Sequence, residues 1–223
     1  MTLAMRVSED IKKDVVDQLY WDDRVDASDV KAEVHDGAIT LSGSVRTYTA
    51  RQAAEEDAWL IAGVIAVNNL LEVVYPTESQ RPDDAQLQAN VATALGWAPD
   101  LEGADADVSV TNGWVMLKGS VDAYWKKLRA EELAATLTGV RGVANELSVV
   151  PSDAYEDKLI ADSIVSALER NMYVDAEDVD VRVSDGIVTL SGGVSSLPAF
   201  QAARETAEYT AGVVGVENEL VIR

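Results

Sequence analysis

The chain has 223 residues, no cysteine, and 39 acidic against 18 basic side chains, which gives a formal net charge of −21 at pH 7. The absence of cysteine excludes disulfides, thiolate metal sites and cysteine nucleophiles. The acidity is spread along the chain without a basic stripe. This argues against a nucleic-acid partner, whose binding depends on neutralising phosphates.

Two further features bear on location. The longest apolar run, 58–67, has 10 residues, roughly half of the ~20 needed to cross a bilayer, so we expect no transmembrane segment. The first seven residues lack a basic start, an apolar core and a small-residue cleavage site, so they do not resemble a signal peptide. The sequence therefore predicts a cytoplasmic protein.

One pattern is written three times: D-G-x-x-T-L-x-G-x-V, followed some 20 residues later by G-V-x-x-V-x-N-x-L. Its copies begin at Asp36, Asn112 and Asp185, at offsets of 76 and then 73 residues. Constant offsets indicate triplication of one small folding unit with a thin core. The predicted units span 1–76, 83–150 and 151–223, with a polar linker at 77–82.

Each unit opens with an amphipathic helix and an acidic loop. In the first copy Ile11, Val15, Val16 and Leu19 are expected on one face of the helix. The equivalent residues are Leu87, Val91, Ala92 and Leu95 in the second copy, and Ile160, Ile164, Val165 and Leu168 in the third.

A hairpin follows. Val30, Ala32 and Val34 alternate with polar residues, which indicates a strand with one buried face. Asp36-Gly37 is a strong signal for a tight turn with positive φ. The second strand contains Gly43, which predicts either a bulge or a close approach of another backbone segment.

An alanine-rich helix is then expected around 49–62, 125–138 and 198–211, with Gly63, Gly139 and Gly212 as C-cap residues. A third strand ends the unit. The predicted class is α+β: three tandem α-β-β-α-β units, each a three-stranded mixed sheet with two helices on one face.

This order and these residues resemble the BON domain family of bacterial modules. The residues that carry the resemblance in the first copy are Gly37, Thr40, Leu41, Ser42, Gly43, Val45, Gly63, Val64, Val67, Asn69 and Leu71. The second copy departs at Trp114, Met116 and Lys118. The resemblance implies a non-enzymatic module, without a catalytic motif to carry over, that associates with phospholipid or envelope components in stress tolerance. It also implies a periplasmic location as the alternative to the cytoplasm.

The polar candidates have simple structural interpretations. An acidic pair precedes the first strand of each copy, at Asp26/Asp29, Glu102/Asp105 and Asp175/Asp178. Carboxylates suit Ca²⁺ or Mg²⁺, but the spacing does not match an EF-hand loop, and turn formation with solvation is the favoured explanation. The single histidine, His35, cannot build a zinc site or a triad by itself. We therefore expect no catalytic residue, metal site or cofactor.

The aromatic residues break the repeat. Trp21 and Trp97 are equivalent, whereas the third copy has Arg170. The segment Tyr124, Trp125, Lys126, Lys127 and Arg129 is a basic-aromatic cluster. Such rings and cations could insert at a bilayer interface or hold a partner, and packing between adjacent units is the alternative.

These observations leave two functional hypotheses. The first is a binding protein that associates with phospholipid or an envelope-type ligand, through Trp21, Trp97 and the basic-aromatic cluster. The alternative is an assembly protein whose units self-associate or dock a protein partner. An enzyme lacks support, since no Walker, Rossmann or G-x-S-x-G motif occurs.

Overall fold

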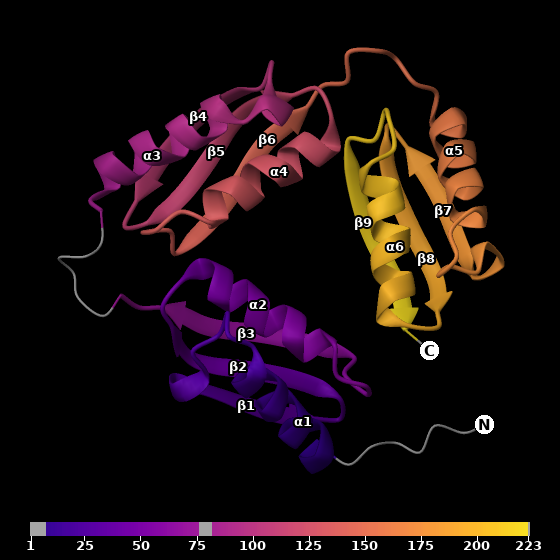
Figure 1. Ribbon diagram of the computed structural model, residues 1–223. Coiled ribbons are helices and arrows are strands. Elements are labelled where there is room, and N and C mark those ends of the chain that lie inside the picture. The colour runs from indigo at the N-terminus through magenta and orange to yellow at the C-terminus, as the bar shows by residue number, and fades with distance from the viewer. Residues whose placement is uncertain (1–7, 76–81, 223) are drawn as a thin grey trace. The chain divides into compact units, whose positions relative to one another are not determined.

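The computed structural model describes residues 8–75 and 82–222, so the first seven residues and nearly all of the predicted linker lie outside the described part (Figure 1). Each unit runs helix, short 3₁₀ turn, two strands, helix, strand. The first unit contains α1 (Ser8–Trp21), β1 (Val30–His35), β2 (Ala38–Val45), α2 (Tyr48–Trp59) and β3 (Ala66–Val73). The second contains α3 (Asp84–Trp97), β4 (Asp105–Thr111), β5 (Trp114–Val121), α4 (Tyr124–Ala135) and β6 (Gly142–Val149). The third contains α5 (Asp157–Glu169), β7 (Val179–Ser184), β8 (Ile187–Val194), α6 (Leu197–Glu208) and β9 (Gly215–Ile222).

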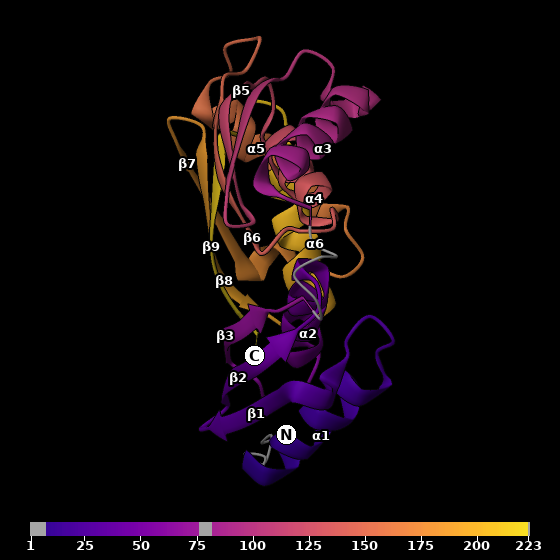
Figure 2. The ribbon, with the colours of Figure 1, turned by 90° about the vertical axis from the view of Figure 1, so that its left-hand side faces the viewer.

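Each unit has a mixed sheet with its second strand in the centre. The strand orders are β1-β2-β3, β4-β5-β6 and β7-β8-β9. In the first and third units the outer pairs are antiparallel for the hairpin and parallel across the helical crossover. Figure 2 shows α1 and α2 on the same face of the first sheet. The predicted α+β class with three tandem units is confirmed.

The hairpin turns adopt the conformation that their residues favour. φ is 51° at Asp36 and 83° at Gly37, and the equivalent residues of the other two units are also positive. Two consecutive positive φ values are typical of a type I′ turn, which matches the twist of the flanking strands. The last pairs before the turn are His35↔Ala38 and Ser184↔Ile187. The predicted two-residue hairpin loops are therefore confirmed.

Gly43 marks a close approach of two backbone segments. It has φ of +110°, and a Cβ at this position would overlap the carbonyl oxygen of Asp29. Gly119 and Gly192 stand in the same relation to Asp105 and Asp178. Gly43 forms the last pair of the ladder with β1, opposite Val30, and the ladder with β3 continues past it; neither ladder skips a residue. Close approach, and not a bulge, is the reason for glycine here.

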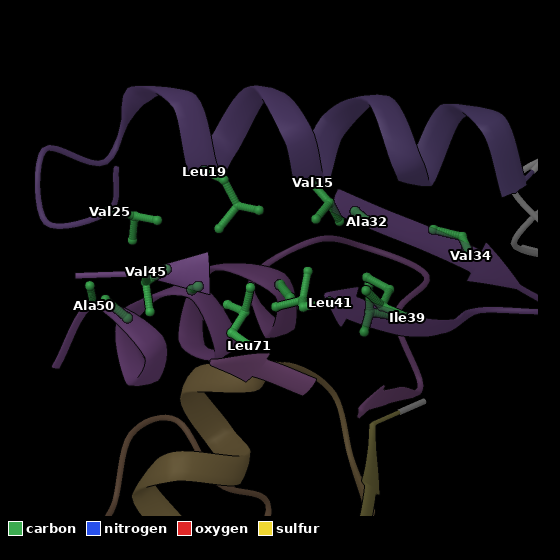
Figure 3. Close-up of a cluster of buried hydrophobic side chains, with 14 of the residues drawn as sticks. Val15, Leu19, Val25, Ala32, Val34, Ile39, Leu41, Val45, Ala50 and Leu71 are labelled. Carbon is green, nitrogen blue, oxygen red and sulfur yellow. The ribbon is translucent and has the colours of Figure 1, made fainter. Parts of the chain in front are cut away.

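The core of the first unit lies between its helices and its sheet. Figure 3 shows Val15 and Leu19 pointing from α1 toward strand side chains such as Leu41, and all three are buried. Val16 was expected on the same face but is 46% exposed. At about 100° per residue, Val16 lies some 60° outside the arc that contains the buried α1 residues. Its equivalents Ala92 and Val165 are exposed as well, which corrects the predicted width of the apolar stripe.

The second helix of each unit ends earlier than expected, and its predicted C-cap glycine has another role. α2 ends at Trp59, and a separate turn follows in which Val64 N donates to Ile61 O at 3.1 Å. Gly63, with φ of +94°, is the third residue of that turn, where positive φ favours glycine. Ile65 N then donates to Gly37 O at 2.9 Å. The two glycine turns of the motif thus lie against each other, and the same bond recurs at Arg141–Gly113 and Val214–Gly186.

Candidate ligand-binding surface at the end of the first helix

At least one large exposed apolar side chain lies at the same place in every unit, where the first helix ends and the chain turns toward the first strand. We call this place the first-helix end. Its exposed members are Val16, Tyr20 and Trp21 in the first unit, Trp97 in the second, and Val165, Met172 and Tyr173 in the third. Exposed apolar patches of this kind often mark binding surfaces. The recurrence in three copies indicates a property of the module.

A groove lies at each first-helix end. In the second unit it has a volume of about 510 Å³ and is lined by Leu95, Trp97, Leu101 and Glu102 among others. Trp97 is 83% exposed at its rim, whereas Leu95 and Leu101 are buried beneath it. The groove therefore has an apolar floor, an aromatic rim and a carboxylate.

Part of the predicted basic-aromatic cluster reaches the same turn. Lys126 donates to the carbonyl oxygen of Glu102 at 3.2 Å, and Arg129 pairs with Asp100 at 2.9 Å. The structure thus brings Trp97, Lys126 and Arg129 together around the 3₁₀ turn at Pro99–Leu101. This grouping could not be read from the sequence spacing.

Two of the three cations of this cluster, Lys126 and Arg129, form ion pairs within their own unit. Lys126 also pairs with Asp122 at 2.8 Å, and its side chain is only 14% exposed. Arg129 also pairs with Glu132 at 2.6 Å, and these hydrogen bonds raise the pKa of its guanidinium. Tyr124, Trp125 and Lys127 are half-buried. Lys126 and Arg129 are therefore locally neutralised, and the role of the cluster as an anion-binding site stays a prediction.

The first unit has a smaller groove of about 290 Å³, lined by residues that include Leu19, Tyr20, Val25 and Asp26. Trp21 is 81% exposed next to it and makes an edge contact with Tyr20, with ring centroids 5.4 Å apart. Asp26 accepts from Ser28 Oγ at 2.7 Å and pairs with Arg46 at 3.0 Å. Hydrogen bonds from Ser28 hold the pKa of Asp26 below its ordinary value.

The third unit has a groove of about 580 Å³ at the equivalent place, which the sequence reasoning missed. Arg170 occupies the tryptophan position, but Met172 and Tyr173 follow within three residues and are 86% and 58% exposed. The available signal was two large apolar residues inside an acidic loop. Glu169, Asp175 and Glu177 line the same groove.

In the first and third units, the first residue of the acidic pair caps the 3₁₀ turn beside the groove. Asp26 and Asp175 are N-cap residues of the 3₁₀ turns and accept from Ser28 N and Glu177 N. This is the turn chemistry considered from the sequence. Within residues 8–75 and 82–222, no group of three or more His, Cys, Asp or Glu side chains is placed to hold a metal. His35 is an exposed strand residue beside the hairpin turn.

The first unit contains a buried carboxyl group, Asp57, where the other two units have residues without a carboxyl. Asp57 of α2 is 1% exposed, and its Oδ1 accepts from Gln18 at 3.0 Å and lies 4.0 Å from Arg24. Burial raises the pKa of Asp57, and the adjacent Asp22 raises it further. Hydrogen bonds from Arg24 lower the pKa of Asp22 to about 2. The equivalents of Asp57 are Leu133 and Thr206, so this network belongs to one copy.

Comparison with known proteins shows to which family the chain belongs. A family model for the BON domain matches residues 8–75, 83–151 and 156–223. This chain belongs to the BON family. Its three BON units each contain the groove described above.

A search of curated proteins finds a relative in Escherichia coli (strain K12), the osmotically-inducible protein Y. The two are 30% identical over 146 residues, which cover 62% of this chain and 72% of the relative. Solved structures of CdsD, a structural protein of the type III secretion system of Chlamydia trachomatis, are 15% identical to this BON protein. They cover 96% and 98% of this chain, and 92% and 100% of their own, with a TM-score of 0.27. A TM-score this low does not establish a shared fold.

Among the described residues of this BON protein, no helix combines the length and the hydropathy that a membrane span requires.

Proposed function

We propose that this BON protein is a non-enzymatic binding protein of a stress response that contacts its ligand through the first-helix ends. One observation carries the proposal: Trp21 and Trp97 occupy equivalent positions in two units and are 81% and 83% exposed. Tryptophan rarely stays this exposed on a surface without a partner, because the ring is large and apolar. Family membership and the similarity to an osmotically-inducible protein support the connection to stress.

A phospholipid surface is the first ligand to test. Indole rings insert at the boundary between headgroups and acyl chains. The net charge of −21 and the local pairing of Lys126 and Arg129 disfavour anionic bilayers. We therefore expect zwitterionic vesicles to bind more strongly than anionic ones at low salt.

Flotation of the full chain with vesicles tests this form of the proposal. Replacing Trp21 and Trp97 together by Ser should reduce the bound fraction at least about tenfold, since each indole removes on the order of 2 kcal/mol of apolar burial. The matched control is Trp114→Ser, which removes a 53%-exposed tryptophan on a strand. Equal loss in the control, or equal binding by the double variant, would count against the first-helix ends.

Docking of a protein partner is the second candidate, favoured by the carboxylates that line the grooves. Either ligand is compatible with both compartments considered from the sequence. Family membership supports the periplasm. Fractionation of cells that express the untagged protein distinguishes the two.

A further inference from the structure

We propose that the groove at the end of α5 docks a segment of a partner protein that carries both apolar and basic side chains. This inference rests on the proposed binding role of the first-helix ends and names the class of partner for one of them. The proposal concerns the third groove alone, because the three grooves differ in the number and the ion pairing of the carboxylates that line them.

The apolar part of the groove is open and large. Met172 and Tyr173 are 86% and 58% exposed, and Val165 on α5 is 37% exposed. Val174 also lines the groove and is buried at 8% exposure. The volume of about 580 Å³ accommodates one or two large side chains of a partner. Methionine is unbranched and adaptable, so it suits a surface that accepts more than one apolar shape.

The charged part of the same groove is unpaired. Among the residues described, Glu169, Asp175 and Glu177 form no ion pair. Asp175 uses one carboxylate oxygen to accept from Glu177 N at 3.2 Å. The other two grooves are each lined by one carboxylate, Asp26 in the first and Glu102 in the second, and Asp26 pairs with Arg46. The third groove therefore presents the largest uncompensated negative charge beside exposed apolar side chains.

Charge complementarity indicates which kind of partner segment fits the groove. A segment with Lys or Arg next to Leu, Ile or Phe would pair with the carboxylates and bury its apolar side chains against Met172 and Tyr173. A second copy of this chain is a poor occupant, since its net charge is −21. An anionic bilayer is disfavoured for the same reason.

A methyl-labelled methionine spectrum of the full chain tests the docking. The chain has four methionines, of which Met172 lies in the groove and Met116 lies in β5 of another unit as an internal control. The probes are a 12-residue peptide of Leu and Lys, a matched peptide of Leu and Glu, and zwitterionic vesicles. We expect the Leu-Lys peptide to shift Met172 and leave Met116 unchanged, with affinity that falls as salt rises.

Two pairs of variants sharpen the test. Glu169→Gln with Glu177→Gln should weaken the Leu-Lys peptide about three- to tenfold, as expected for two exposed charge contacts. Tyr173→Ser should weaken it on the order of tenfold. The controls are Glu219→Gln, an exposed carboxylate on β9, and Tyr209→Ser, a tyrosine that is 68% exposed. Neither control should change the affinity.

Several results would overturn the inference. These are equal shifts with the Leu-Glu peptide, no shift of Met172 with Leu-Lys, or equal weakening in the controls. A shift of Met172 on raising the protein concentration alone would assign the groove to a second copy. A shift caused by vesicles and not by the peptide would assign it to lipid, which leaves the proposed binding role intact. Failure of both probes to bind would remove both proposals.

Discussion

At position 119 only glycine fits, because another backbone segment approaches closely. Gly119 has φ of +122°, and a Cβ there would overlap the carbonyl oxygen of Asp105. Both the positive φ and the absence of a Cβ require glycine here, so this glycine of the repeated motif has a structural role. The repeated glycines therefore specify the module and carry no chemistry.

Gly119→Ala should destabilise the second unit by about 3 kcal/mol or more, since strain and a backbone overlap add. Gly103→Ala is the matched control. Gly103 also has positive φ, +84°, but a Cβ there would meet nothing within 4 Å, so the dihedral alone should cost about 1 to 2 kcal/mol. Amide hydrogen exchange in β4 and β5 measures both, because a three-unit chain need not unfold in two states. Equal costs would refute the close-approach explanation.

Asp57 gives the first unit a pH dependence of its own. Its folded-state pKa is raised above the ordinary value of 3.8, so it contributes stability below that pH and loses the contribution as pH rises. Asp22 acts in the opposite sense, because its pKa of about 2 gives stability above 3.8 that is lost on further acidification. The two effects can be separated by replacing one of the two carboxyl groups with a side chain that does not titrate.

Asp57→Asn should stabilise the first unit at pH 7 by on the order of 1 kcal/mol, because it removes a buried negative charge that lies next to Asp22. The gain should shrink toward pH 4, where the native carboxyl is increasingly protonated in both states. Hydrogen exchange of α1 and α2 amides at the two pH values measures the difference. Asp57→Ala, which leaves Gln18 without its acceptor, should destabilise at both. A loss of stability in Asp57→Asn at pH 7 would show that the native charge is needed beside Arg24.

At the scale of elements, one asparagine ties the second helix to the third strand. Asn145 Nδ2 donates to Lys127 O at 2.7 Å and to Glu131 at 3.2 Å, and its Oδ1 accepts from Leu147 N. Asn69 makes the same three bonds in the first unit. In the third unit the glutamate is replaced by Arg204, and Asn218 Nδ2 is buried without a partner.

Asn145→Ala should therefore cost about 2 to 3 kcal/mol, and Asn218→Ala about 1 kcal/mol, in proportion to the hydrogen bonds that each removes. Unit-resolved hydrogen exchange compares the two substitutions in otherwise equivalent contexts. Equal costs would mean that the asparagine acts through packing and not through its bonds to the helix.

The elements themselves were largely predictable, because each is specified by local residues. Alternation and Asp-Gly turns locate the hairpin, and the offsets show that it recurs. The predicted end of α2 was wrong because Gly63 belongs to a separate turn after the helix. In the sequence, a glycine in such a turn resembles a helix C-cap glycine. The departure at Trp114 was visible but unexplained until the structure placed its ring over Gly142, where a Cβ would overlap the ring.

The candidate site was only partly predictable. Trp21 and Trp97 were identified because they interrupt the repeat, and both lie exposed at a helix end. The grouping of Lys126 and Arg129 around the turn of another helix depends on tertiary packing, so it could not be read from spacing. The third groove was missed because its apolar residues lie two and three positions beyond Arg170.

At the scale of the whole molecule, the charge is the dominant property. A net charge of −21 opposes contact between copies, although every sheet has two edge strands that could pair. Self-association thus remains a prediction that requires screening by salt or cations. A ligand that is neutral or basic meets no such barrier.

The most direct measurement of the central claim is a fluorine spectrum of the full chain labelled with 5-fluorotryptophan. The five tryptophans give one signal each. Titration with zwitterionic vesicles, and separately with the Leu-Lys peptide, reports which rings meet the ligand. If the first-helix ends bind, the signals of Trp21 and Trp97 change with at least one probe, while those of Trp59, Trp114 and Trp125 stay constant. Changes confined to Trp114 or Trp125, or no change with either probe, would contradict the account.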